Sequence, residues 1–167
     1  MSVLENIFDR AKARAARVVL PEIEDPRIAE AAQQLRAKGL ADPIPLSPVN
    51  DAMVAGLVER RGLKDAIARR MLAKPLFRAA AMVASGAADA MVAGADSPTK
   101  RVIEAASIVI GLRPGVRTPS SFFLMLFPDG RDMIFADCAV NLAPDAGQLA
   151  DIARASEQSA KALLDRV

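Results

Sequence analysis

The chain has 167 residues, of which 52% are apolar and 25% are charged, and its net charge is only +2. This balance excludes a disordered chain, and the scattered basic residues argue against a nucleic-acid-binding stripe. The absence of His and the single Cys exclude His-dependent nucleophilic catalysis and an internal disulfide, and they make a zinc or haem site improbable.

No apolar run reaches the roughly 18 residues that a membrane-spanning helix needs. The N-terminus lacks the basic segment and apolar core of a signal peptide. We therefore expect a cytoplasmic protein with neither a membrane nor a nucleic-acid partner.

The first part of the chain alternates between strands and helices. An amphipathic helix at residues 3–15 precedes a buried strand at residues 17–20. Asp25–Pro26 suits the start of a second helix, which Gly39 ends. A weak strand at residues 42–46 completes a strand–helix–strand unit, which implies a parallel sheet.

Helices are expected at residues 51–60 and 64–85, with a break or restart at Lys74–Pro75 because proline cannot donate a backbone hydrogen bond. Gly86 should end the second of them. The candidate core positions in this stretch are Met71, Leu72, Ala79, Met82 and Val83.

A buried strand at residues 89–93 leads through a Gly-led loop, residues 94–99, into another helix. Ser97 suits the N-cap of that helix and Pro98 its first position. Such a loop can offer backbone N–H groups to a phosphate, and the hydroxyls of Ser97 and Thr99 add donors. On spacing alone, an ordinary strand–helix turn with a serine cap is favoured.

Residues 121–127 and 132–140 read as a hairpin of two strands around the turn Pro128–Arg131. Both strands are almost wholly apolar, so we expect burial on both faces. Because the start of one strand lies beside the end of the other, polar groups should converge there over an apolar floor, as in a ligand site. These groups are Arg117, Thr118, Ser120, Ser121, Asp137, Cys138 and Asn141.

Two features of this edge suggest chemistry. Arg117 with Ser120 and Ser121 suits a phosphate or carboxylate, and the alternative is a solvated Arg beside a turn. Cys138 has an acidic neighbour, Asp137, and no adjacent His or Lys, so a site-lining, unreactive thiol is favoured over a nucleophile.

Three arginines on the helices, Arg69, Arg70 and Arg78, could also bind anions, although a solvated helix face is favoured. The final helix begins at Asp145, which forms a capping box with Gln148. No strand follows it, so we expect the chain to end inside a second unit. One face of this helix carries Leu149, Ile152, Ala153, Ser156, Ala160, Leu163 and Leu164.

Several segments, in order and at similar spacing, resemble the phosphate acetyl/butyryltransferase family. They are residues 17–27, residues 88–95 with Thr99, residues 120–125, residues 135–141 and residues 148–153. The chain departs from the family pattern at Pro98, where Ser is usual, and between Leu46 and Leu63, where it is shorter.

The resemblance implies a three-layer α/β sandwich similar to isocitrate and isopropylmalate dehydrogenases, truncated to about the first half of a two-domain, homodimeric enzyme. Residues 1–128 would form the first domain without its C-terminal completion. Residues 129–167 would begin the second domain.

The resemblance also implies reversible transfer of an acetyl group between CoA and inorganic phosphate, with CoA and acetyl-CoA as substrates and no bound cofactor or metal. The family's general base is an Asp of the C-terminal portion, so no catalytic residue is assigned here. A butyryl-transferring member and a non-catalytic binding or dimerisation fragment remain alternatives. The expected substrate-binding residues are Arg117, Ser120, Ser121, Cys138, Ser97 and Thr99, with Arg70 a weaker candidate for a CoA phosphate.

Overall fold

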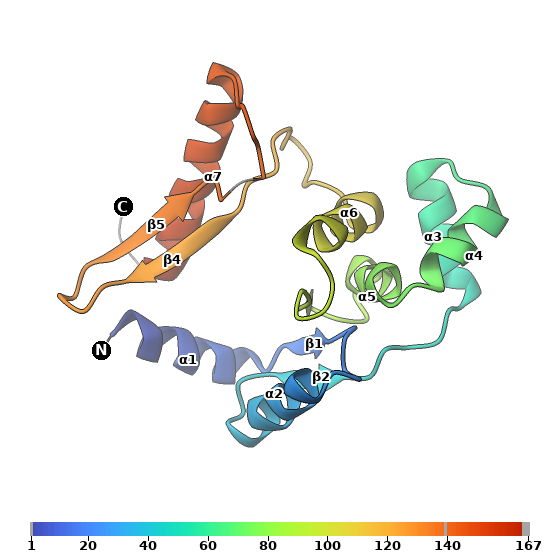
Figure 1. Cartoon of the computed structure of the whole chain (residues 1–167), viewed down its shortest axis with the longest axis horizontal. Coiled ribbons are helices and arrows are strands. Elements are labelled where there is room, and N and C mark those ends of the chain that lie inside the picture. The colour runs from blue at the N-terminus through green and yellow to red at the C-terminus, as the bar shows by residue number, and fades with distance from the viewer. Residues whose placement is uncertain (1, 139, 165–167) are drawn as a thin grey trace. The chain divides into compact units, whose positions relative to one another are not determined.

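The computed structural model describes residues 2–138 and 140–164, and its helices and strands follow the expected order (Figure 1). The chain splits into two compact units, one of Phe8–Gly111 and one of Met1–Ile7 with Leu112–Val167. The elements are α1 (Val3–Arg14), β1 (Arg17–Val19), α2 (Pro26–Ala37), β2 (Asp42–Ile44), α3 (Asp51–Arg61), α4 (Asp65–Leu72), α5 (Pro75–Ala84), β3 (Ala90–Met91), α6 (Thr99–Val109), β4 (Phe122–Leu126), β5 (Asp132–Ala136) and α7 (Ala146–Leu164).

The Phe8–Gly111 unit is built on the predicted parallel sheet, with strand order β2-β1-β3. Alternate side chains of a strand point to opposite faces, and β1 uses both faces. Val19 is fully buried in a core formed with α3, α4, α5 and α6, whereas Val18 and Leu20 pack with Ala32 of α2. Helices therefore cover both faces of the sheet (Figure 1).

The predicted helix break at Lys74–Pro75 is confirmed, because α4 ends at Leu72 and α5 begins at Pro75. The predicted core positions are confirmed as well. Leu72, Ala79 and Met82 are buried, and two partly buried side chains, Met71 and Val83, pack against this core.

Local capping signals are confirmed at α2, where the Asp25 carboxylate accepts the N–H of Arg27 and Pro26 is the first helical residue. At α6 the prediction was wrong by one residue, because Pro98 is the N-cap and Thr99 the first residue. The N–H of Ser97 donates instead to Glu22, so the loop continues through Ser97. Strand β3 is also shorter than predicted, and it is half-buried.

The second unit contains the predicted hairpin, in which β4 and β5 pair antiparallel with Phe122 opposite Ala136. Helix α7 packs against β5 and begins with the predicted capping box. The N–H of Asp145 donates to the Gln148 side chain at 2.9 Å, and the N–H of Gln148 donates to the Asp145 carboxylate at 2.8 Å.

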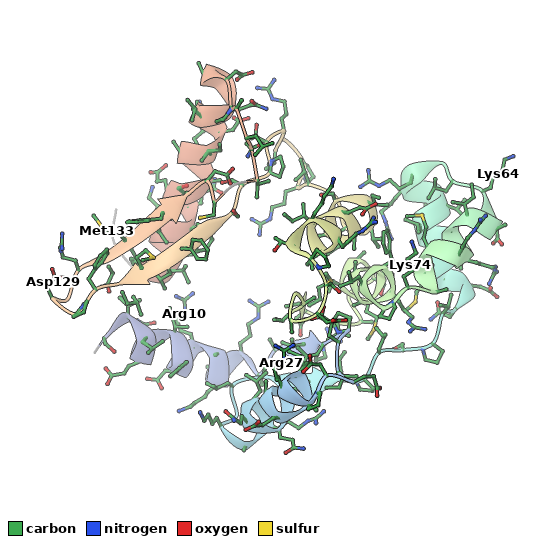
Figure 2. The ribbon with its side chains drawn as sticks, in the orientation of Figure 1. Arg10, Arg27, Lys64, Lys74, Asp129 and Met133 are labelled. Atoms are coloured by element: carbon green, nitrogen blue, oxygen red, sulfur yellow. The ribbon has the colours of Figure 1, made fainter. Side chains whose placement is uncertain are left out.

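The prediction that the hairpin is buried on both faces was wrong. Phe123 and Phe135, which are opposite each other across the strands, are 63% and 48% exposed. Met133 is also exposed on the hairpin (Figure 2). The physical reason is that a two-stranded sheet has two faces, and a single helix such as α7 covers only one of them.

The predicted apolar face of α7 is correct only in part, because Ile152 is buried but Leu149 is 54% exposed and Ala153 is exposed. The predicted return strand ends early, at Ala136. Met1, Ala139 and residues 165–167 fall within predicted segments but lie outside the described residues.

Residues 112–128 group with the hairpin in this chain, whereas the expected boundary at residue 128 assigned them to the first domain. That boundary concerns the longer proteins of the family and stays a prediction. Within residues 2–138 and 140–164, no helix is long and apolar enough to cross a membrane.

Candidate functional site

Five of the seven polar groups predicted to meet at the open end of the hairpin do so, and Asp137 is the main acceptor among them. One carboxylate oxygen accepts the N–H of Ser121 at 2.9 Å, and the other accepts the backbone and side-chain N–H groups of Asn141 at 2.7 and 3.0 Å. The hydroxyls of Ser120 and Ser121 lie 3.4 Å from the first oxygen. The side chain of Asn141 also donates to the carbonyl of Pro119 at 2.7 Å. We call Ser120, Ser121, Asp137, Cys138 and Asn141 the hairpin-edge cluster.

The ionised form of Asp137 is stabilised by these contacts. Burial raises the pKa of Asp137, but the hydrogen bonds from Ser121 and Asn141 outweigh that effect and hold the pKa below its usual range. Because both oxygens are already engaged, Asp137 serves as an anchor for the two strand ends rather than as a proton acceptor.

Cys138 joins the cluster through its backbone and its thiol. Its N–H donates to the Ser121 hydroxyl at 3.2 Å, and its thiol donates to the carbonyl of Phe135 at 3.2 Å. Neither contact brings a cation to the sulfur, so the geometry supports a site-lining thiol.

We expect Cys138→Ala to retain most of the acetyl-transfer activity that the family resemblance implies, within about threefold in kcat, because the thiol supplies only one weak hydrogen bond. Steady-state kinetics of the two proteins check this. Isolation of an acyl-Cys138 intermediate that turns over at the catalytic rate would contradict it.

Arg117 and Thr118 have different surroundings. The hydroxyl of Thr118, which is buried, donates to Asp151 of α7 at 3.0 Å. Arg117 is exposed and takes no part in the hydrogen bonds of the hairpin-edge cluster among the described residues. A contact between its guanidinium group and a substrate anion stays a prediction.

The loop of residues 94–97, in the other unit, already holds an anion that belongs to the chain. The Glu22 carboxylate accepts the N–H groups of Gly94, Ala95 and Ser97 at 2.8 Å each, and that of Asp96 at 3.4 Å. Gly94 has a φ of +118°, which side chains disfavour and which helps to turn successive N–H groups to one point. The backbone donors that were predicted for a phosphate are thus used by Glu22, and a contact from the Ser97 or Thr99 hydroxyl stays a prediction.

Glu22 is the residue that sequence reasoning missed. Burial raises its pKa, but the hydrogen bonds from Ser97, Ala95 and Gly94 lower it to about 2. The available signal was topological. Glu22 follows β1 and the 94–97 loop follows β3, and the carboxyl ends of neighbouring parallel strands meet at one edge of a sheet.

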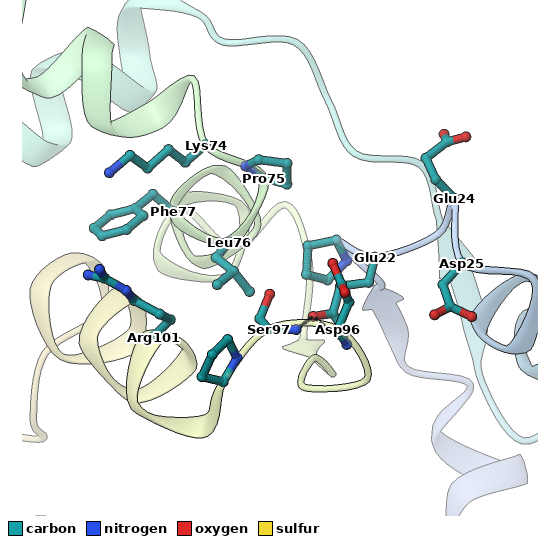
Figure 3. Close-up of a pocket in the computed structure, with 12 residues that line it drawn as sticks. Glu22, Glu24, Asp25, Lys74, Pro75, Leu76, Phe77, Asp96, Ser97 and Arg101 are labelled. Carbon is teal, nitrogen blue, oxygen red and sulfur yellow. Dashed lines mark hydrogen bonds between the residues drawn. The ribbon is translucent and has the colours of Figure 1, made fainter.

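A cavity of about 710 Å³ lies beside this loop, between Pro21–Asp25, the α4–α5 junction and the start of α6 (Figure 3). Lys74 and Arg101 line it near Phe77, and the carboxylates gather toward the Glu22 side. The Lys74 amine lies 5.7 Å from the centre of the Phe77 ring, and Arg101 pairs with Glu104 at 2.8 Å. The cavity therefore has a cationic end and an acidic end.

The remaining candidates of this unit are placed differently. Ser97 lines the cavity, whereas Thr99 and Arg70 do not and are exposed. Arg69 pairs with Asp51 and Asp65 on the helix surface, as the solvated-face interpretation predicts. Arg78 lines a second hollow of about 490 Å³. Among the described residues, no group of three or more His, Cys, Asp and Glu is placed to hold a metal ion.

A parallel sheet with helices on both faces and polar loops at the carboxyl ends of its strands defines an α/β protein. A family model described as phosphate acetyl/butaryl transferase matches residues 2–53 and 49–167. The chain belongs to the phosphate acetyl/butyryl transferase family.

Individual relatives agree with this assignment. The chain is 38% identical to a phosphate acetyltransferase of Paracoccus denitrificans, over 98% of this chain and 59% of the relative. It is 28% identical to the crystal structure of a phosphotransacetylase from Streptococcus pyogenes, with a TM-score of 0.88 over 95% of this chain and 57% of that one. A Staphylococcus aureus phosphotransacetylase gives 29% identity and a TM-score of 0.85. The chain thus spans less than two thirds of the length of these proteins.

Proposed function

We propose that this protein takes part in the reversible transfer of an acetyl group between CoA and inorganic phosphate. The observation that carries the proposal is the family match along almost the whole chain, joined by relatives named phosphate acetyltransferase. The matched residues include the hairpin-edge cluster and the 94–97 loop.

The reaction brings a thiolate or a phosphate to a polarised acyl carbonyl, so it needs cations for the anionic substrates and donors around the reacting atoms. In our proposal Arg117 binds an anionic group, and Ser120, Ser121 and Cys138 line the same site. Arg70 stays a weaker candidate for a phosphate of CoA. The general base of the reaction is not assigned to any of these residues.

The finer features implied by the family remain part of the proposal. They are a three-layer sandwich similar to the isocitrate and isopropylmalate dehydrogenases, a homodimer, a cytoplasmic location, and CoA and acetyl phosphate as substrates without a bound cofactor.

The test is phosphate-dependent release of CoA from acetyl-CoA by the native protein, followed with a thiol reagent, together with measurement of the acetyl phosphate formed. Thiol release that requires phosphate and matches the acetyl phosphate mole for mole supports the proposal. Thiol release without acetyl phosphate, or none at all, contradicts it.

We expect Arg117→Ala to lower kcat/KM for phosphate or CoA roughly tenfold, the lower range for loss of a charge-assisted contact, because Arg117 is exposed to solvent. Arg131→Ala is the matched control. Arg131 is an exposed arginine of the same unit that pairs with Asp129 at the hairpin turn. Equal kinetics for the two variants would remove Arg117 from the site.

A further inference from the structure

The four N–H groups of the 94–97 loop form a small concave site of the kind that binds anions. Its occupant is the carboxylate of Glu22, with three contacts of 2.8 Å. Contacts this short between backbone donors and an ionised acceptor are among the stronger hydrogen bonds in proteins. The Glu22 carboxylate therefore already occupies the loop, and no substrate phosphate is needed to hold the loop in this conformation.

A second contact ties the same two segments together. The guanidinium of Arg27 donates to the carbonyl of Ala95 at 3.1 Å, and Asp25 holds that guanidinium at 2.6 Å. Side chains of the segment after β1 thus bind the segment after β3 at two kinds of backbone group, the N–H groups of residues 94–97 and the carbonyl of Ala95. These contacts join groups 68 to 75 residues apart in the chain.

The 94–97 loop also forms one wall of the cavity. Asp96 and Ser97 line it, and the chain continues directly into α6, which carries Arg101 to the cationic end (Figure 3). A shift of the loop would move Ser97 and Arg101 relative to Lys74, which is held on the α4–α5 junction.

We propose that Glu22 is a positioning residue: the chain fills an anion-binding loop with its own carboxylate and so holds Ser97 and Arg101 in place along the cavity wall. The filling of the loop stands on the contacts alone. The benefit to a substrate rests on the proposed function, with CoA as the ligand whose binding the cavity wall supports.

The first experiment removes the Glu22 carboxylate from the loop and replaces it with a small anion from solution. In Glu22→Ala the four N–H groups face an open space, and formate is the probe. We expect formate to raise the melting temperature of this variant by about 3 °C more than chloride of equal ionic strength does. The wild-type protein and Glu24→Ala, a control from the same segment, should show no such difference. A formate effect that is absent, or equal in all three proteins, overturns the proposal.

A second variant keeps the test decisive if Glu22→Ala does not fold. Glu22→Gln preserves size but turns an amide NH₂ toward backbone donors, so about half of the contacts are lost. Hydrogen exchange of the Gly94, Ala95 and Ser97 amides should become at least roughly tenfold faster than in the wild type. Unchanged exchange at all three amides means that Glu22 does not hold the loop.

Kinetics separate positioning from general stability. In the native protein Glu22→Gln should raise the KM for CoA by roughly 10- to 100-fold while kcat changes by less than about threefold. Glu30→Gln, an exposed change on α2, is the control. A fall in kcat alone, or an unchanged KM, removes the positioning role. If the wild type has no acetyl-transfer activity, the proposed function fails, and the formate and exchange results still decide the role of Glu22.

Discussion

Replacement of Asp137 by Ala is expected to lower the free energy of unfolding by about 3 kcal/mol for the unit that contains the β4–β5 hairpin. The change leaves the N–H of Ser121 and both N–H groups of Asn141 without their acceptor. These donors are half-buried, so water replaces only part of the lost bonding. Because the same contacts hold the two strand ends together, the candidate site should loosen with the fold.

Urea unfolding followed by circular dichroism measures this effect. Glu157→Ala is the control, since Glu157 makes an exposed pair with Lys161, and such pairs contribute little to stability. A difference between the two variants of less than about 0.5 kcal/mol would mean that Asp137 does not anchor the hairpin edge.

Acid should destabilise the Phe8–Gly111 unit through Glu22. The pKa of Glu22 is about 2 in the folded protein against an ordinary value of 4.5. The folded state therefore binds this proton less readily than the unfolded state, and the stabilisation is complete above pH 4.5 and lost as the pH falls toward 2. After allowance for solvent screening of a partly exposed carboxylate, we expect Glu22 to contribute about 2–3 kcal/mol of this loss.

The comparison of wild type with Glu22→Gln isolates this contribution, because Asp25 and Asp89 also have pKa values of about 2 and titrate in both proteins. Urea midpoints measured between pH 6 and pH 3 should fall more steeply for the wild type, so that the two curves converge in acid. Parallel curves would show that protonation of Glu22 is not linked to folding.

The elements that could be predicted are those with local signals. Asp25–Pro26 starts α2, Pro75 restarts the helix, and Asp145 with Gln148 caps α7, and each signal acts within four residues. The meeting of Ser121 with Asp137 was predictable for a related reason, because the short turn of a hairpin places the two strand ends side by side.

What could not be predicted depends on contacts between distant parts of the chain. The apolar pattern around Phe123 and Phe135 shows that β4 and β5 are hydrophobic, but it does not show which elements cover them. The bond between Glu22 and Gly94 joins residues 72 apart, and it requires knowing that β1 and β3 are neighbours. The pattern allowed either an anion-binding loop or an ordinary turn at residues 94–97, and it did not show that a carboxylate of the same chain accepts these N–H groups.

The strand order β2-β1-β3 also has a consequence for the sequence of events during synthesis. Val18 pairs with Pro43 on one side and with Ala90 on the other, so β1 and β2 are available to each other long before β3 leaves the ribosome. Local pairings generally form faster than distant ones. We expect β1, α2 and β2 to assemble first, with Glu22 still a solvated carboxylate. The emergence of residue 97 then supplies the last of the four N–H donors to Glu22, and α6 follows to complete the core of the unit.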